Sequence, residues 1–111
     1  MSDLKVEILL PLYYNSDTRG KRSRVEGAKY AQTYSEIIGR FGGCTVDNST
    51  LLGGWINPDT GKKIRDENVT YWVVCRDTRS NIRFLFNLKK RLKERFLQDE
   101  IMMYYIQIHR I

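Results

Sequence analysis

Few residues in this chain could do chemistry, and their spacing excludes most familiar catalytic sites. The single histidine, His109, lies near the end of the sequence, and no serine and aspartate can be assigned to it as a triad. The segment Asn15–Gly20 lacks the repeated glycines and the Gly-Lys-Ser/Thr ending of a phosphate-binding loop. Asp3, Asp17 and Asp47 are scattered among lysines and arginines, so they predict no metal site. We therefore expect no catalytic residue, no metal ion and no cofactor.

Two carboxylates and a group of basic side chains remain as candidates for binding. Glu67 and Glu100 are expected to form ion pairs with Arg65 or Arg95, since such pairs are more common than catalysis by two carboxylates. A polar segment from residue 15 to 24 carries four basic side chains around Gly20: Arg19, Lys21, Arg22 and Arg24. A helix is expected to start just after it, and helix starts favour anions. The sequence therefore predicts a site for an anionic ligand or an acidic partner here, with a solvated mobile loop as the alternative.

The two cysteines, Cys44 and Cys75, form neither a disulfide framework nor a metal-binding spacing. The chain does not start with a charged and then apolar leader, and no apolar run approaches the roughly 20 residues that cross a bilayer. We therefore expect a cytoplasmic protein, with no membrane partner, whose thiols are free and buried. The two sulfurs would be neighbours if the second strand starts beside the end of the third.

The elements that must position these residues follow a pattern that is written twice. An apolar strand, Lys5–Tyr14, precedes an amphipathic helix that ends at Gly42 and Gly43. A second apolar strand, 69–76, precedes a helix that ends near Phe96. A broken strand and a hairpin turn at residues 57–61 separate the two units, and a strand from 101 to 111 follows the second helix.

This order of elements predicts one α+β domain over residues 1–111 with a ferredoxin-like βαββαβ fold. Right-handed crossovers favour a four-stranded antiparallel sheet in the spatial order four, one, three, two, with both helices on one face. The topology also brings the end of the first strand beside the starts of the third and fourth. We assign the anion or partner site to this end of the sheet, with ten residues: Arg19, Lys21, Arg22, Arg24, Tyr14, Trp55, Arg65, Glu67, Gln98 and Glu100.

The sheet face without helices is expected to be apolar, and so it needs a cover. Its predicted side chains are Leu9, Tyr13, Trp72, Val74, Met103 and Tyr105. A second copy of the chain is the simplest cover, which predicts a homodimer through Leu9, Trp72, Val74, Met103 and Tyr105. Stacking of Trp72 and Tyr105 on nucleic acid bases is the alternative, although the strand signature of RNA-recognition domains is absent.

Several short motifs recur in a known group of proteins. They are Arg-Phe-Gly-Gly-Cys-Thr at 40–45, Gly54-Trp55, Gly61, Glu67, and Arg-Phe-Leu-Gln-Asp-Glu-Ile at 95–101. With these motifs, the chain from about Leu9 to Ile108 resembles a family of small, uncharacterised bacterial proteins with a ferredoxin-like fold. The resemblance implies the fold, and no established reaction comes with it.

The net charge of +6 and the pI near 9.5 are compatible with a phosphate-rich partner. The second predicted helix contributes six basic side chains: Arg83, Lys89, Lys90, Arg91, Lys93 and Arg95. No helix-turn-helix, zinc-finger or glycine-clamp motif accompanies them. We therefore expect a non-catalytic binding or accessory module that forms a homodimer. The alternatives are a nucleic-acid-binding protein, through the basic segment and second helix, and a small dimeric enzyme at the Trp55, Glu67 and Gln98 end.

Overall fold

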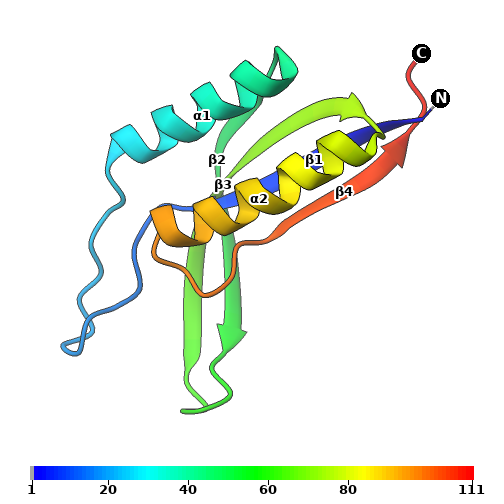
Figure 1. The fold of residues 1–111 in the computed structure, drawn as a ribbon. Coiled ribbons are helices and arrows are strands. Elements are labelled where there is room, and N and C mark those ends of the chain that lie inside the picture. Colours follow the sequence, from blue (N-terminus) through cyan, green and yellow to red (C-terminus); the bar gives the residue numbers. More distant parts are fainter. Residues whose placement is uncertain (1) are drawn as a thin grey trace.

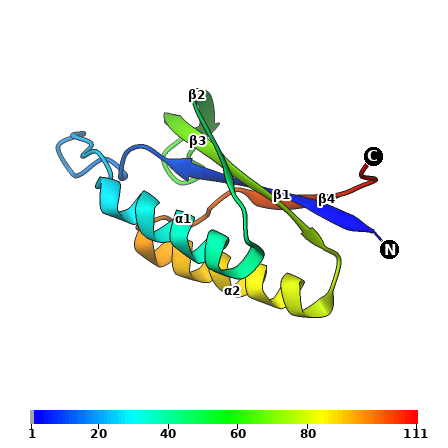
Figure 2. The ribbon, with the colours of Figure 1, turned by 90° about the horizontal axis from the view of Figure 1, so that it is seen from above.

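The computed structural model describes residues 2–111 and has the predicted fold. Its strands form one antiparallel sheet in the order β2-β3-β1-β4, and both helices lie on the same face of that sheet (Figures 1 and 2). The predicted α+β class, the element order and the strand order are therefore confirmed. The elements are β1 (Asp3–Pro11), α1 (Gly27–Phe41), β2 (Thr45–Ile56), β3 (Lys63–Arg76), α2 (Arg79–Arg95) and β4 (Met103–Ile108).

The core lies between the sheet and the helix layer. Strand β1 alternates strictly, and every second residue is buried against the helices: Leu4, Val6, Ile8 and Leu10. Leu88, Leu92 and Phe96 of the α2 region reach this layer with essentially no exposed surface. Burying each such side chain stabilises the fold by about 1.5 to 3 kcal/mol relative to leaving it in water. Alternation along β1 therefore decides which of its faces meets the helices.

The end of α1 and the start of α2 carry the local signals expected from the sequence. Gly42, which follows α1, has φ 78° and donates its N–H to the carbonyl of Ile38 over 2.8 Å. This left-handed conformation favours glycine because other residues have a Cβ that crowds the backbone there. At the start of α2, the side chain of Thr78 accepts a hydrogen bond from the amide of Asn81 over 3.1 Å.

Strands β2 and β3 continue past the end of β1 as a two-stranded arm, residues 51–67 (Figure 1). Its tip is the predicted hairpin turn, in which Gly61 has φ 68° and donates its N–H to the carbonyl of Asn57 over 2.8 Å. The pairing of the arm is displaced from that of the sheet body by an irregularity between Asp47 and Leu51. The arm therefore begins at this irregularity and leaves Leu52 and Ile56 largely exposed.

The face of the sheet away from the helices differs from the prediction in one strand. Leu9, Trp72 and Val74 are on this face, because they alternate with the buried residues of β1 and β3. In β4, Met103 is opposite Ile8 and Tyr105 is opposite Val6, so both are on the helix-facing side. The prediction that Met103 and Tyr105 lie on the face without helices is therefore wrong, because the alternation along β4 is shifted by one residue. Tyr104 and Ile106 take their places on the face without helices.

Both cysteines are free, with Cys75 buried and Cys44 half-buried. Burial raises the pKa of the Cys44 thiol to about 11 and also raises the pKa of Cys75. The two thiols are therefore protonated at neutral pH. Within residues 2–111, neither helix is long and apolar enough to cross a membrane.

Candidate functional site

The end of β1 is held between two other segments of the chain. Pro11 lacks an amide hydrogen and is the last residue of the strand. Leu12 then donates its N–H to the carbonyl of Glu67 over 2.9 Å, and Tyr14 donates its N–H to the carbonyl of Ser23 over 2.8 Å. Val25 closes the return by donating to the carbonyl of Leu12 over 2.9 Å. These bonds fix two consecutive tyrosines, Tyr13 and Tyr14, between the start of α1 and strand β3.

The segment from 15 to 24, which we call the basic loop, contains a defined turn. The Asp17 carboxylate accepts hydrogen bonds from the amides of Arg19 and Lys21 over 2.8 and 2.9 Å. Gly20 supports the turn with φ 78°. Arg19 and Lys21 therefore lie at the exposed tip of a hydrogen-bonded turn, and the mobility of this loop stays a prediction.

Tyr13 faces a cation that also contacts a carboxylate. The guanidinium of Arg22 lies 4.7 Å from the centre of the Tyr13 ring, and one of its nitrogens lies 3.5 Å from a carboxylate oxygen of Glu67. Another nitrogen of Arg22 donates to the carbonyl of Arg65 over 3.3 Å. The guanidinium of Arg24 lies 5.7 Å from the same ring. An aromatic face and a carboxylate that contact the same guanidinium are both groups that attract cations.

Tyr14 has a similar environment made from other residues. Its hydroxyl donates a hydrogen bond to the Glu26 carboxylate, and the ammonium of Lys29 lies 4.7 Å from the centre of its ring. Lys29 and Glu26 are also 3.7 Å apart as an ion pair. The hydrogen bond from Tyr14 lowers the pKa of Glu26, and contact with Tyr14 raises the pKa of Lys29. Both charges are therefore present at neutral pH.

Half of the residues assigned to this site from the sequence gather at the end of β1, namely Tyr14, Arg22, Arg24, Arg65 and Glu67. The pairing predicted for Glu67 is corrected, because it pairs with Arg22 through its side chain and not with Arg65. Sequence reasoning did not identify Glu26 and Lys29, the partners of Tyr14. Their spacing of three residues at a helix start is an ion-pair signal, although nothing in it names Tyr14.

Trp55, Gln98 and Glu100 are not brought into contact with the Tyr13 site by any bond among residues 2–111. Trp55 is paired with Ile64 and therefore lies on the same face of the arm as Ile64. Faces alternate along a strand, and Ile64 is three residues from Glu67, so Trp55 and Glu67 lie on opposite faces. Gln98 donates its side-chain amide to the carbonyl of Phe96 over 3.1 Å. Glu100 pairs with Lys89 over 2.9 Å, which together with a bond from its own neighbour lowers the pKa of its carboxyl. Anion binding by Arg19 and Lys21 at the loop tip stays a prediction.

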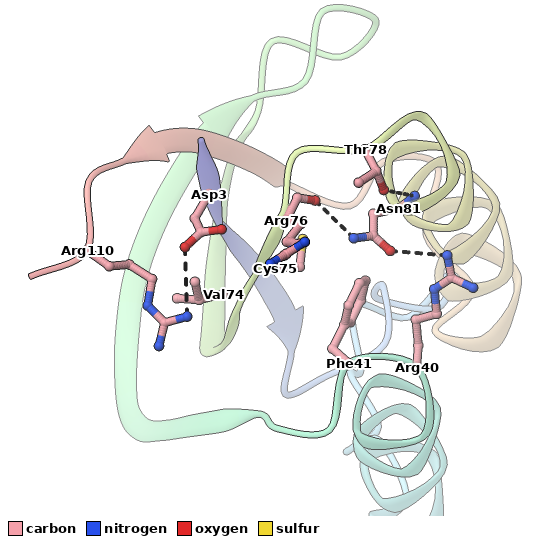
Figure 3. A pocket seen from close by; sticks show the side chains of 9 residues that line it. All are labelled: Asp3, Arg40, Phe41, Val74, Cys75, Arg76, Thr78, Asn81 and Arg110. Atoms are coloured by element: carbon pink, nitrogen blue, oxygen red, sulfur yellow. Dashed lines mark hydrogen bonds and ion pairs between the residues drawn. The ribbon is translucent and has the colours of Figure 1, made fainter. Parts of the chain in front are cut away.

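A second candidate is a cavity of about 510 Å³ at the opposite end of the sheet, where β1 begins and β3 ends (Figure 3). Its polar side chains satisfy one another: Arg40 donates to Asn81 over 3.1 Å, and Asn81 donates to the carbonyl of Arg76 over 2.9 Å. Asp3, the one carboxylate of its lining, lies 3.8 Å from Arg110. With three arginines and one aspartate, this cavity disfavours a cationic ligand.

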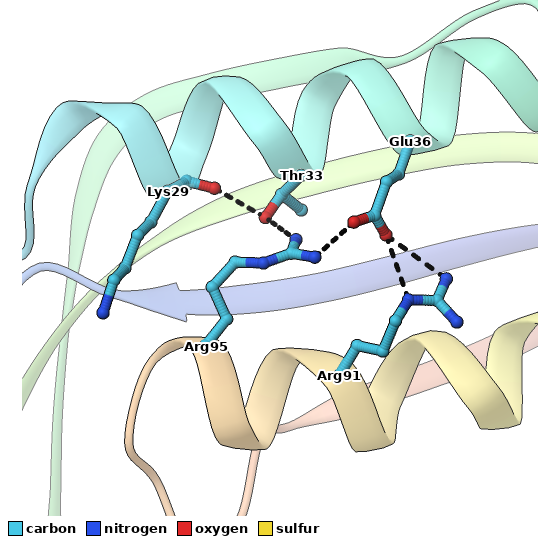
Figure 4. A network of polar contacts seen from close by, with 5 residues as sticks. All are labelled: Lys29, Thr33, Glu36, Arg91 and Arg95. Atoms are coloured by element: carbon cyan, nitrogen blue, oxygen red, sulfur yellow. Dashed lines mark hydrogen bonds and ion pairs between the residues drawn. The ribbon is translucent and has the colours of Figure 1, made fainter.

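A third set of polar side chains links α1 to α2, and its role is structural (Figure 4). Arg95 of α2 donates to the hydroxyl of Thr33 over 2.8 Å and to the carboxylate of Glu36, both on α1. Arg91 lies 3.2 Å from the same carboxylate, and Thr33 donates in turn to the carbonyl of Lys29 over 2.8 Å. Arg95 is thus the partner of Glu36, and the expectation that it pairs with Glu67 or Glu100 is wrong.

No protein-family model and no curated protein sequence matches this chain. Among solved structures, the chain is similar to a phage SAM lyase in complex with S-methyl-5′-thioadenosine, with a TM-score of 0.62 and 13% sequence identity. The match covers 97% of this chain and 90% of that one. At this identity the likeness shows the fold alone, and the resemblance to a family of small bacterial proteins stays a prediction. The match nevertheless corrects the expectation of a non-catalytic module, because the solved protein with this fold is an enzyme, and it favours the alternative of a small enzyme.

Proposed function

We propose that this protein is a lyase that cleaves S-adenosylmethionine at the end of β1. The observation that carries the proposal is the likeness to a phage SAM lyase over almost the whole of both chains. The site at Tyr13 adds independent support, since S-adenosylmethionine carries a sulfonium cation that cannot donate a hydrogen bond. Tyr13 and Glu67 both contact the guanidinium of Arg22, and an aromatic ring and a carboxylate attract such a cation without needing a donor from it.

The proposed reaction needs no nucleophile or acid from the protein. A lyase breaks its bond without water, and S-methyl-5′-thioadenosine can leave without a base on the protein if a group of the substrate attacks the γ-carbon of the amino-acid chain, which is bonded to the sulfonium. The carboxylate of the substrate's own amino-acid chain can do so, forming a C–O bond as the C–S bond breaks. The bonding pair of the C–S bond moves to sulfur, and the remaining four carbons leave as homoserine lactone. No proton changes place, which agrees with a sequence that holds no recognisable triad.

The protein's contribution would then be to bind the substrate and fold it into the reactive shape. We assign the sulfonium to the Tyr13 ring and the Glu67 carboxylate. Arg24, 5.7 Å from the same ring, is placed to orient the substrate's carboxylate. Holding these two opposite charges near each other within one substrate favours the intramolecular attack over hydrolysis.

Incubation of the full chain with S-adenosylmethionine tests the proposal. We expect S-methyl-5′-thioadenosine and homoserine lactone to form in equal amounts, measured by liquid chromatography and mass spectrometry, faster than in a blank without protein. Oxygen-18 water separates the two reaction types, because the lactone must form without the label. Cleavage no faster than the blank, or label present in the first amino-acid product, contradicts the proposal.

We also propose that two copies of the chain associate through the face of the sheet without helices. That face is apolar at Leu9, Trp72 and Ile106, and its charges are balanced, with Lys5 over the Trp72 ring and Tyr104 donating to Glu7. The chain as a whole carries +6, so copies that meet at a neutral surface avoid most of their mutual repulsion. Strand β4 is at the sheet edge, which leaves its outer backbone groups open for pairing as well.

Trp72→Glu is expected to convert the associated protein into a monomer, because it places a charge in the centre of this face. Sedimentation velocity measures the change. Tyr34→Glu is the matched control, an aromatic residue of the helix layer that is also partly exposed, and it should leave the association unchanged. A wild-type chain that sediments as a monomer at 100 μM, or a Trp72→Glu variant that stays associated, contradicts the proposal.

A further inference from the structure

We infer that the Tyr13 ring and the Glu67 carboxylate form a site for a sulfonium or quaternary ammonium cation, and that Arg22 fills this site when no ligand is bound. The identification of the ligand as a sulfonium rests on the proposed function, whereas the cation site itself rests on the geometry. The guanidinium of Arg22 stands in the place that the ligand's positive charge would take. The ligand must displace it, so Arg22 competes with the ligand inside the same chain.

Each contact of the Arg22 guanidinium is one that attracts positive charge. The ring of Tyr13 lies on one side at 4.7 Å, the Glu67 carboxylate at 3.5 Å and the carbonyl of Arg65 at 3.3 Å. A ring face, a carboxylate and a carbonyl oxygen are the groups that surround cations that cannot donate hydrogen bonds. The ring follows the end of β1 and the two oxygen groups belong to β3, and all three contact one charged group.

The contacts of the Arg22 guanidinium are weak enough for a ligand cation to displace it. Its carboxylate and carbonyl distances exceed the 2.7 to 2.9 Å typical of a strong charged hydrogen bond, and each is a single contact and not a bidentate one. The side chains of Arg22 and Glu67 keep 33% and 23% of their surface exposed. Ion pairs of this kind contribute little net stability, because water competes for both partners. A cation that also gains contacts through the rest of its molecule can therefore take the place of Arg22.

The backbone around Arg22 allows this exchange without unfolding the basic loop. The turn on one side is closed by Asp17, which also donates its own N–H to the carbonyl of Lys21 over 2.9 Å. On the other side Ser23 and Val25 are bonded to Tyr14 and Leu12. Arg22 lies between these two anchored pieces, so rotation of its side chain alone would open the site.

The test replaces Arg22 with methionine, which keeps an unbranched side chain and removes the charge. Trimethylsulfonium serves as the probe, and its affinity is measured from the NMR shifts of the Tyr13 ring. We expect Arg22→Met to bind trimethylsulfonium about tenfold more tightly than the wild type, because the internal competitor is gone. Arg22→Lys should restore the weaker, wild-type affinity, and Arg19→Met at the loop tip should change nothing.

The same variants separate this inference from the proposed function. If the wild type does not cleave S-adenosylmethionine but Arg22→Met still binds trimethylsulfonium more tightly, the cation site stands and the lyase proposal falls. If cleavage occurs but Arg22→Met binds the probe equally or more weakly, Arg22 is not a competitor and the inference is overturned. Where both hold, the KM of Arg22→Met for S-adenosylmethionine should fall by a similar factor.

Discussion

Replacing Glu67 with glutamine is expected to lower kcat/KM for the cleavage of S-adenosylmethionine by about 100-fold. Glutamine keeps the size of the side chain and one hydrogen-bond acceptor, but it removes the negative charge that contacts the same guanidinium as the Tyr13 ring. Two opposite unit charges about 4 Å apart near a protein surface attract each other by about 4 kcal/mol, solvent removes part of this, and each step of about 1.4 kcal/mol is a factor of ten in rate. The sulfonium loses its charge as the C–S bond breaks, so Glu67 holds the bound substrate at least as strongly as the transition state. Most of the loss should therefore appear as a higher KM.

Initial rates of S-methyl-5′-thioadenosine formation over a range of substrate concentrations measure this effect. Glu100→Gln is the matched control, since it makes the same substitution at a carboxylate in the segment after α2, which is paired with Lys89 of that helix. Its kcat/KM should stay within about twofold of the wild type. A Glu67→Gln variant that also stays within twofold would remove Glu67 from the site, even if the protein cleaves the substrate.

The fold could be read from the sequence largely because apolar periodicity decides the buried side of β1, α1 and α2. Alternation along β1 and the stripes of both helices each have one apolar phase, so the buried side follows from the residue types. Strand β4 is apolar in both phases, with Met103, Tyr104, Tyr105 and Ile106 in succession. The side of the sheet on which each β4 side chain lies is decided instead by the connection from α2, in which Ile101 is buried just before the strand begins. A prediction from alternation alone could not choose the phase, and it chose the wrong one.

Five of the ten residues that the sequence predicts at the end of β1 do lie there, but the sequence does not predict their contacts with one another. Strand order alone brings the basic loop to the start of β3, so Arg22 and Glu67 could be expected at the same end. The side of the arm on which Trp55 lies depends on the register of the hairpin, which the turn residues do not fix by themselves. The proposed reaction would give the expectation of a protein without catalysis a chemical cause. A reaction whose nucleophile belongs to the substrate leaves no nucleophile, base or metal-binding motif in the sequence.

Removal of the Glu36 carboxylate by Glu36→Ala is expected to lower the free energy of unfolding by about 2 to 3 kcal/mol. The side chain of Arg95 is only 9% exposed, and it lies between the helices with Glu36 as its counter-charge and Thr33 as its other partner (Figure 4). Without Glu36, this guanidinium would stay charged in a place that water hardly reaches. Glu36 itself is 24% exposed, so solvent moderates the loss below that of a fully buried pair. Urea unfolding followed by circular dichroism measures the change.

Two further variants show whether the loss comes from the stranded charge. Arg91→Ala removes the other partner of Glu36. The side chain of Arg91 is 43% exposed, so its loss should lower the free energy of unfolding by less than about 1 kcal/mol. The double variant Glu36→Ala with Arg95→Met should recover most of the loss of Glu36→Ala, because replacing both members of a buried pair with apolar groups is often neutral. A double variant as unstable as the single one would assign the loss to packing between the helices. Recovery would instead assign the loss to the Arg95 charge that Glu36→Ala leaves without a counter-charge between the helices.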